Sequence, residues 1–180
     1  MSENKCRYCA GELKPVTTLF LPIPNKYFAS REEARAALRM PHALAACTAC
    51  GSHSLTNTPF TPDELFAGNY AFVPVGASWK NHCVELARAI RARLPGPASW
   101  VYDIGGNDGL LTEVLYRIVG GPAINIDPSD VPSIQQGHIP KRKGFFGESF
   151  ARSLLRDGDG LAHVITAANV LAPVLDSLDF

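Results

Sequence analysis

The stretch that decides the fold runs from residue 99 to residue 119 and reads SWVYDIGGNDGLLTEVLYRIV. Its first part, residues 99–105, predicts a buried β-strand, and residues 109–119 predict a helix. The turn between them, DIGGNDG, is rich in glycine, which lets a backbone approach a ligand closely. The helix that follows directs free amide groups toward the same place. This combination of strand, turn and helix predicts a nucleoside-binding site.

Strand and helix signals continue to alternate downstream, which is the pattern of a parallel α/β sheet. We expect strands over residues 123–129 and 143–147, and a fourth strand with its exit loop over residues 163–172. Helices are expected over residues 131–136 and 149–157. A doubly wound domain has two halves, and these segments supply the first half and one further strand. The expected fold class is therefore α/β, with an incomplete parallel sheet.

Four of the five cysteines form two Cys-x-x-Cys pairs near the other end of the chain: Cys6 with Cys9, and Cys47 with Cys50. In a reducing compartment such pairs are metal ligands more often than disulfides. Together they supply the four thiolates of a closed tetrahedral zinc site, which has no open position for catalysis. We predict a structural zinc, with free or redox-active thiols as the alternative. His42 and His53 are nearby substitutes for one ligand.

The region around these cysteines is rich in proline and poor in long periodic segments, so it cannot bury a large core alone. A short helix is expected from an N-cap at Ser30 to Leu38. TPDELF, from residue 61, predicts another helix start, and an apolar stripe over residues 79–94 predicts a longer helix. We expect three parts: a zinc-binding domain over residues 1–60, a helical linker or cap over residues 61–97, and an incomplete cofactor-binding domain over residues 98–180.

Charge and hydropathy exclude several classes of partner. The 17 basic and 17 acidic side chains cancel, so no overall field attracts nucleic acid or an anionic membrane. We interpret the basic run KRK at residues 141–143 as a solvated strand entry. The apolar runs are far shorter than the roughly 20 residues that cross a bilayer, and the start MSENKCRYC has no signal-peptide core. We expect a cytoplasmic protein with a small-molecule substrate and no nucleic-acid or membrane partner.

The identity of the ligand is indicated by two acidic residues. Asp127 ends the second expected strand, where a carboxylate can accept both hydroxyls of a ribose. With Asp103 at the end of the first strand, the surroundings suit a ligand with positive charge better than a pyrophosphate. The dinucleotide fingerprint Gly-x-Gly-x-x-Gly is not met. S-adenosylmethionine has an amine and a sulfonium, and NAD has neither, so we predict S-adenosylmethionine as the cofactor.

Nine short motifs occur in order along the chain: CRYC, LPIPN, CTACG, TPDELF, SWKNH, DIGGNDG, IDPS, FFGE and ITAANVLAPVLD. With them the chain resembles the S-adenosylmethionine-dependent sugar C-methyltransferases of deoxysugar biosynthesis, which have an N-terminal zinc-binding domain. The resemblance runs from Cys6 to Phe180. It implies a Rossmann-like class I methyltransferase fold and methyl transfer to carbon. The implied substrate is a small metabolite, with a nucleotide-linked keto-deoxysugar as the best match.

The resemblance also implies roles for individual residues. Those expected around the cofactor are Asp103, Gly105, Gly106, Asn107, Asp127, Phe145, Phe146 and Asn169. Either Phe145 or Phe146 is expected to flank the adenine. The substrate is expected to contact Tyr70, Ser78 and His82, and His82 is the candidate catalytic residue.

The chain departs from the family at several positions. Pro173 stands where the family has a histidine, and Tyr70 is not followed by the family's second tyrosine and paired serines. The family continues for about another domain, which supplies the histidine and glutamate thought to act as base and substrate ligand. We expect that half in a longer chain or in a partner. The alternatives are a truncated, non-catalytic zinc-stapled module that binds S-adenosylmethionine or a protein, and a nicotinamide-dependent oxidoreductase, which the broken fingerprint disfavours.

Overall fold

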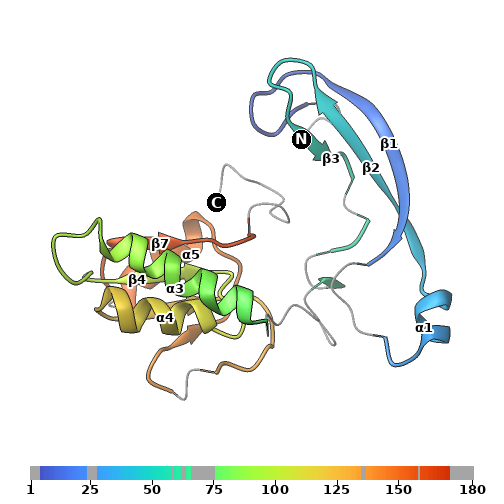
Figure 1. Ribbon diagram of the computed structural model, residues 1–180. Coiled ribbons are helices and arrows are strands. Elements are labelled where there is room, and N and C mark those ends of the chain that lie inside the picture. Colours follow the sequence, from blue (N-terminus) through green and yellow to red (C-terminus); the bar gives the residue numbers. More distant parts are fainter. Residues whose placement is uncertain are drawn as a thin grey trace. The chain divides into compact units, whose positions relative to one another are not determined.

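The computed structural model describes residues 5–23, 28–57, 59–61, 64–65, 76–134, 137–157 and 159–170. The chain forms two compact units, Met1–Ala71 and Phe72–Phe180. Each unit contains its own β-sheet, and the two sheets differ in kind (Figure 1). Among the described residues, none of the helices combines the length and the apolar character that a bilayer crossing requires.

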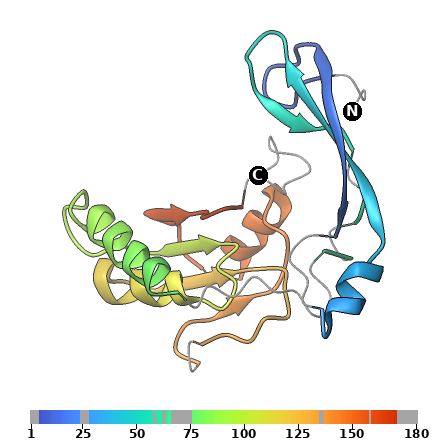
Figure 2. The same cartoon turned by 45° about the vertical axis from the view of Figure 1, so that its right-hand side comes forward.

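The first unit is a three-stranded antiparallel sheet in the order β1-β2-β3. Its strands are β1 (Leu13–Pro22), β2 (Arg39–Cys47) and β3 (His53–Leu55). The register of β1 shifts between Pro15 and Thr17. Pro15 has no N–H to donate to the neighbouring strand. At one end of the β1–β2 hairpin Leu13 pairs with Cys47, which places both cysteine loops there. The helix α1 (Arg31–Ala36) lies at the other end (Figure 2).

This long hairpin was not expected from the sequence, which is rich in proline and poor in long periodic segments in this region. Nearly every side chain of β1 is exposed, so the strand lacks the alternation of buried and exposed residues that reveals a strand in a sequence. Backbone pairing with β2 along its whole length therefore defines it.

Two expected helix starts are confirmed by their caps. The Ser30 hydroxyl accepts the N–H of Glu33 at 3.1 Å, and α1 follows, ending two residues before the expected Leu38. At Thr61 the hydroxyl accepts the N–H of Glu64 at 3.2 Å, while the Glu64 carboxylate accepts the N–H of Thr61 at 2.6 Å. This reciprocal pair is a capping box. The remainder of that expected helix, and Tyr70 with it, lies outside the described residues.

The second unit is built on a parallel sheet whose strands lie in the order β6-β5-β4-β7. The strands are β4 (Val101–Ile104), β5 (Ala123–Ile126), β6 (Lys141–Arg142) and β7 (Val164–Thr166). The helices are α3 (Ala77–Arg91), α4 (Leu110–Val119) and α5 (Glu148–Arg156). The mixed α/β class and the parallel four-stranded sheet are confirmed.

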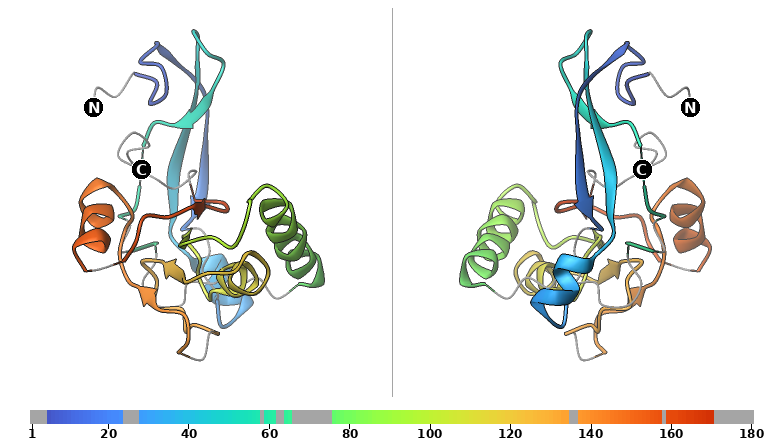
Figure 3. Two further views of the ribbon diagram at one scale, coloured as in Figure 1. Left: turned by 90° about the vertical axis from the view of Figure 1, so that its left-hand side faces the viewer. Right: turned by 90° about the vertical axis from the view of Figure 1, so that its right-hand side faces the viewer.

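The helices cover both faces of this sheet, giving three layers (Figure 3). On one face α3 and α4 bury a cluster that includes Ala87, Leu115 and Val101. On the other face α5 contributes Leu154 to a cluster with alternate strand residues such as Ile124. Both faces of β4 and β5 are therefore buried, which is why these strands read as apolar runs in the sequence.

Two local expectations are wrong. The third strand was expected at residues 143–147, but pairing with β5 ends at Arg142. At Gly144 the chain passes so close to the Phe150 ring that an added Cβ would lie 2.5 Å from it, and Phe146 packs on the same ring. A helix was expected over residues 131–136, and residues 131–134 are not helical; residues 135–136 lie outside the described part. The N–H of Ile134 bonds instead to the carbonyl of Asp108, at 2.8 Å.

Candidate functional site

The four paired cysteines converge in the first unit. The sulfur atoms of Cys6, Cys9, Cys47 and Cys50 all lie within 4.8 Å of one another. Two of the separations are 3.8 Å, between Cys6 and Cys50, and 3.5 Å, between Cys9 and Cys47. Tetrahedral zinc with Zn–S bonds of about 2.3 Å requires sulfurs about 3.8 Å apart. The cluster is therefore close enough to hold a metal ion, with a geometry compatible with zinc.

The two cysteine loops repeat the same backbone path. In the first, the N–H of Ala10 donates to the carbonyl of Cys6 at 2.9 Å. In the second, the N–H of Gly51 donates to the carbonyl of Cys47 at 3.1 Å. The residue after each second cysteine is left-handed, with φ of 57° at Ala10 and 72° at Gly51. Each loop thus presents two thiols in an equivalent turn.

The Ser52 hydroxyl supports the thiolate form of two of the four cysteines, and Gly11 allows the close packing of the cluster. The Ser52 hydroxyl lies 3.3 Å from Cys6 Sγ and 3.1 Å from Cys50 Sγ. Its hydrogen bond is the largest of the effects that lower the pKa of the Cys6 thiol to about 6, which favours the thiolate that binds metal. Gly11 packs against the cluster so tightly that an added Cβ would lie 3.0 Å from Cys47 Sγ and 2.8 Å from the Ala49 Cβ. Within the described residues, the histidines considered as substitutes do not join the cluster.

The second candidate site lies at the carboxyl edge of the parallel sheet. Because β4 and β5 are parallel, the residues that follow them meet at the same edge. The N–H of Gly105, after β4, donates to the carbonyl of Ile126 at 2.7 Å. The N–H of Asn107 donates to the Asp127 carboxylate at 3.0 Å. The glycine-rich turn and Asp127 are therefore in direct contact.

Asp103 is buried beneath this turn, with 1% of its surface exposed. Its two carboxylate oxygens accept hydrogen bonds from the hydroxyls of Thr112, on α4, and Thr166, on β7, both at 2.7 Å. Burial raises the pKa of Asp103 to about 6, against the lowering effect of the two hydroxyls. The carboxylate thus joins three elements beneath the turn, and its contact with a cofactor stays a prediction.

Asp127 occupies the expected place immediately after β5 and is 5% exposed. Its Oδ1 accepts the N–H of Ser129 at 2.9 Å and the Ser129 hydroxyl, and lies 3.6 Å from the Lys141 ammonium. Oδ2 accepts the N–H of Asn107. The carboxylate therefore holds the backbone of the glycine-rich turn in place through hydrogen bonds. Its recognition of a ribose stays a prediction.

Asn107 is the most unusual residue of the turn. Its φ is 54°, and its backbone is held on both sides: the N–H by Asp127, and the carbonyl by Asn125 Nδ2 and Lys141 Nζ, each at 3.2 Å. Its side chain is buried, and neither the amide nitrogen nor the amide oxygen has a hydrogen-bond partner among the described residues. Buried polar groups are almost always paired. The Asn107 amide is therefore the clearest candidate for contact with a ligand.

The two glycines that precede Asn107 are required by their surroundings. An added Cβ on Gly106 would lie 2.4 Å from Asn125 Oδ1 and 2.9 Å from Asp103 Oδ2. Gly105 has φ of 68°, and an added Cβ there would lie 2.4 Å from Val170 Cγ2. The sequence predicted close approach of this backbone to a ligand; the structure shows close approach to other parts of the protein.

A pocket of about 360 Å³ adjoins the end of β7 and is lined by Trp79, His82, Leu86, Thr166, Ala167, Ala168 and Asn169. It brings together His82 and Asn169, which are far apart in the sequence. The ring of His82 lies 5.3 Å from that of Trp79, and Thr166 connects the pocket to the buried Asp103. Ser78 is exposed on α3 and is not part of this lining.

The two phenylalanines expected at an adenine have different surroundings. Phe146 is half-buried and packs against the apolar cluster beside Phe150, with ring centroids 6.5 Å apart. Phe145 is 50% exposed. Contact of either ring with an adenine stays a prediction.

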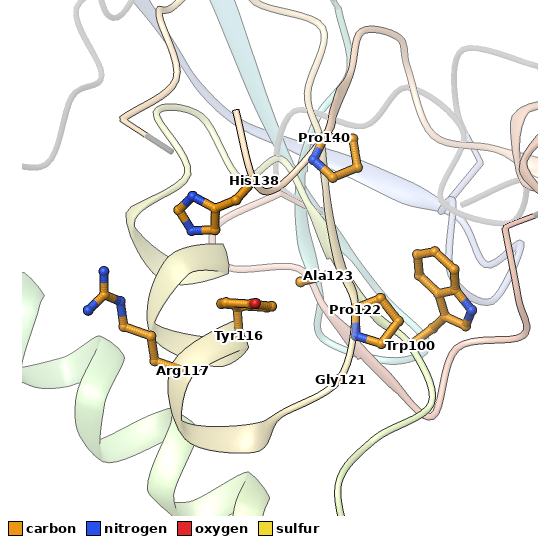
Figure 4. Close-up of a pocket in the computed structure, with 8 residues that line it drawn as sticks. All are labelled: Trp100, Tyr116, Arg117, Gly121, Pro122, Ala123, His138 and Pro140. Carbon is orange, nitrogen blue, oxygen red and sulfur yellow. The ribbon is translucent and has the colours of Figure 1, made fainter. Parts of the chain in front are cut away.

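A larger pocket of about 650 Å³ lies at the opposite edge of the sheet, where the strands begin (Figure 4). Its lining includes Trp100, Tyr116 and Ala123, none of which the sequence indicated as a ligand contact. The basic groups at its rim already contact one carboxylate: Glu113 accepts from Arg117 at 2.5 Å and lies 2.9 Å from His138 Nε2. This pocket contains none of the expected cofactor residues.

Several residues of the carboxyl edge were missed in the sequence. Asn125, Thr112 and Thr166 are polar residues inside buried apolar segments, and that contrast is the signal that could have found them. Lys141 was interpreted as part of a solvated basic run, and this is wrong, because its ammonium is inside the network and its side chain is only 17% exposed. Lys143, in contrast, is 61% exposed and pairs with Asp130.

Neither a scan against protein-family models nor a search of curated proteins finds a match for this chain. The family resemblance therefore stays an expectation, and the function has to be argued from the site.

Proposed function

We propose that the second unit binds S-adenosylmethionine at the carboxyl edge of its sheet, and that the protein is a C-methyltransferase acting on a small metabolite. The observation that carries this proposal is the buried amide of Asn107, which has no hydrogen-bond partner in the described part of the chain and lies on a glycine-rich turn that contacts Asp127. An amide whose NH2 group and oxygen are both free suits a ligand that offers acceptors and donors, as a nucleoside does.

The strand order supports a Rossmann-like assignment. Numbered along the chain, the four strands lie in the order third, second, first, fourth, which is the start of the doubly wound order. In such sheets ligands bind where the order reverses, at the carboxyl ends of the strands. Here that place is between β4 and β7. The glycine-rich turn follows β4, and the segment of the smaller pocket follows β7.

The charges at this edge favour S-adenosylmethionine over a dinucleotide. Asp103, Asp108 and Asp127 are all buried there, and Lys141 offsets part of their charge. A pyrophosphate would add further negative charge, whereas an amine and a sulfonium would reduce it. When bound, S-adenosylmethionine supplies an electrophilic methyl group. Asn107 and Asp127 would hold it, with Asn169 at the neighbouring pocket.

The acceptor is proposed to be a small metabolite with a carbon acid beside a carbonyl, and a nucleotide-linked keto-deoxysugar is the best match. Transfer to such a carbon requires a base that removes the proton and a pocket that aligns the carbon with the methyl group. The smaller pocket presents the His82 imidazole, which is the candidate for contact with the acceptor. For the first unit we propose a structural zinc on the four cysteines, because four protein ligands leave no open position.

The test is calorimetry with S-adenosylhomocysteine on the wild-type chain and on Asn107→Gly. Glycine tolerates the left-handed φ of 54°, so this change removes the amide without adding strain. We expect affinity to fall about tenfold, because one or two hydrogen bonds to the ligand are lost.

Asp127→Asn should weaken binding by about tenfold to a hundredfold. It also disturbs the turn, because Asp127 accepts the N–H groups of Asn107 and Ser129. The matched control is Asp130→Asn, the same change on an exposed carboxylate of the same loop, which should leave affinity unchanged. Equal affinity in wild type and Asn107→Gly would contradict the site, and tighter binding of NAD than of S-adenosylhomocysteine would contradict the cofactor.

A further inference from the structure

The ammonium of Lys141 joins loops that belong to two different strands. Its Nζ donates to the carbonyl of Asn107, after β4, at 3.2 Å, and to the carbonyl of Val131, after β5, at 2.8 Å. It also lies 3.6 Å from the carboxylate of Asp127. Two of the three donors of the ammonium therefore bond to backbone carbonyls, and the Asp127 carboxylate is its ion-pair partner.

The fold brings Lys141 to this position through β6. This strand has only two residues, and Lys141 is aligned with Asn125 of β5. The N–H of Asn125 bonds to the carbonyl of Pro140 at 3.0 Å, and the N–H of Asp127 bonds to the carbonyl of Arg142 at 3.1 Å. Backbone pairing on both sides of Lys141 thus fixes where its side chain starts.

We propose that Lys141 is a positioning residue: its ammonium holds the loops after β4 and β5, and with them Asn107 and Asp127, in the arrangement that ligand binding requires. The part of this inference that concerns affinity rests on the proposed function. The part that concerns the loops does not, because the contacts join groups of the protein itself.

The physical reason is that one cation interacts with two acceptors, the Asn107 carbonyl and the Asp127 carboxylate, which lie close together in a buried place. Asn107 and Asp127 are 7% and 5% exposed. Without the ammonium, the Asp127 carboxylate and the Asn107 carbonyl lose a charged donor in a poorly hydrated place, which is costly for each acceptor. Opening of the loops toward water would relieve that cost. Opening would break the Asn107–Asp127 and Ser129–Asp127 hydrogen bonds, which share the same carboxylate.

The test compares Lys141→Met with Lys143→Met. Both changes replace a lysine of the same basic run by an uncharged side chain of similar length, but Lys143 is exposed and bonded to Asp130. Residue-resolved amide hydrogen exchange on the protein without ligand should show loss of protection in Lys141→Met at Asn107, Ser129 and Ile134, by about tenfold or more. The amides of α4 should keep their protection, which shows that the unit is still folded. Lys143→Met should match the wild type.

The variant Lys141→Arg separates charge from packing. It retains a cation with several donors, so its protection at the three amides should lie between the wild type and Lys141→Met. Affinity for S-adenosylhomocysteine should follow the same order. Unchanged exchange in Lys141→Met would overturn the inference. So would an arginine variant whose three amides exchange as fast as those of the methionine variant. If exchange changes as expected but the wild type binds no S-adenosylhomocysteine, the positioning role stands and the proposed cofactor fails.

Discussion

The two units differ in what can stabilise them. In the described part of the first, the buried apolar cluster consists of Cys6, Leu13, Ala45 and Cys47, and two of these are members of the sulfur cluster. In the second, separate clusters on both faces of the sheet bury large side chains such as Leu115, Ile124 and Leu154. A small unit with so little apolar burial needs another source of stability. The comparison supports the proposal that metal binding stabilises the first unit, while apolar burial stabilises the second.

The largest effect is expected from removing one sulfur of the cluster. Cys47→Ser should abolish zinc binding and unfold the first unit, because structural zinc contributes an apparent 10–16 kcal/mol or so in small zinc domains. Elemental analysis of the purified protein and circular dichroism check this. Full zinc content in the variant, together with an unchanged circular dichroism spectrum, would contradict it.

The matched control is the same change at Cys83. This cysteine is fully buried in the apolar cluster of the second unit. Cys83→Ser places a hydroxyl there and should lower the stability of that unit by about 1–3 kcal/mol, with zinc content unchanged.

Deleting apolar volume from the second unit should give the next largest effect. Leu115 is fully buried between α4 and the sheet. Leu115→Ala should lower the free energy of unfolding of this unit by about 2–5 kcal/mol. Urea denaturation followed by tryptophan fluorescence measures it, since both Trp79 and Trp100 lie in this unit. A loss of zinc in this variant would show that the units are not energetically separate.

Much of the second unit could be predicted from the sequence, because burial on both faces leaves apolar runs and helical spacing. Residues 99–105 and 109–119 were placed correctly, with β4 and α4 slightly shorter than expected. The cysteine cluster was also predicted, since ligand spacing is local information. The β1–β2 hairpin was missed because its exposed side chains follow no pattern of burial.

The ligand edge was predicted only in part. Asp127 and the glycine-rich turn were placed at one edge because strand ends are visible in a sequence. Lys141 was missed, because its role depends on which carbonyls the loops present to it, and that is a property of the tertiary structure. The aromatic pair at residues 145–146 was taken for a strand, whereas the packing of Phe146 on Phe150 favours a loop.

The buried Asp103 should make the stability of the second unit depend on pH. Its pKa is raised by burial from 3.8 to about 6, so between these values the folded protein binds more protons than the unfolded chain. Stability should therefore fall as pH rises from about 4 to about 6, by about 3 kcal/mol for this group. Urea denaturation across this pH range should show that the stability of Asp103→Asn does not decline in this way.

Asp130 is the control for that titration. Its hydrogen bond with Lys143 lowers its pKa, so its contribution to stability is lost as pH falls. This is opposite to the pH dependence expected from Asp103. Asp130→Asn should leave the decline between pH 4 and 6 in place. An identical pH profile in wild type and Asp103→Asn would contradict the buried state of Asp103.

The smallest effect is expected at the equivalent turns of the two cysteine loops. Ala10 and Gly51 share a left-handed backbone, which glycine adopts without strain and alanine does not. Ala10→Gly should stabilise the zinc-bound first unit by up to about 1 kcal/mol, and Gly51→Ala should destabilise it by about 1–2 kcal/mol. Competition with a chelator ranks the zinc affinities of the wild type and the two variants. Equal zinc affinity in all three would contradict the equivalence of the loops.

Residue-resolved hydrogen exchange, with and without a zinc chelator, tests the central comparison most directly. After metal removal we expect the amides of Leu13–Pro22 and Arg39–Cys47 to lose their protection, while those of Val101–Ile104, Ala123–Ile126 and Leu110–Val119 keep theirs. Protection of the first unit that survives chelation, or loss of protection throughout both units, would contradict the account.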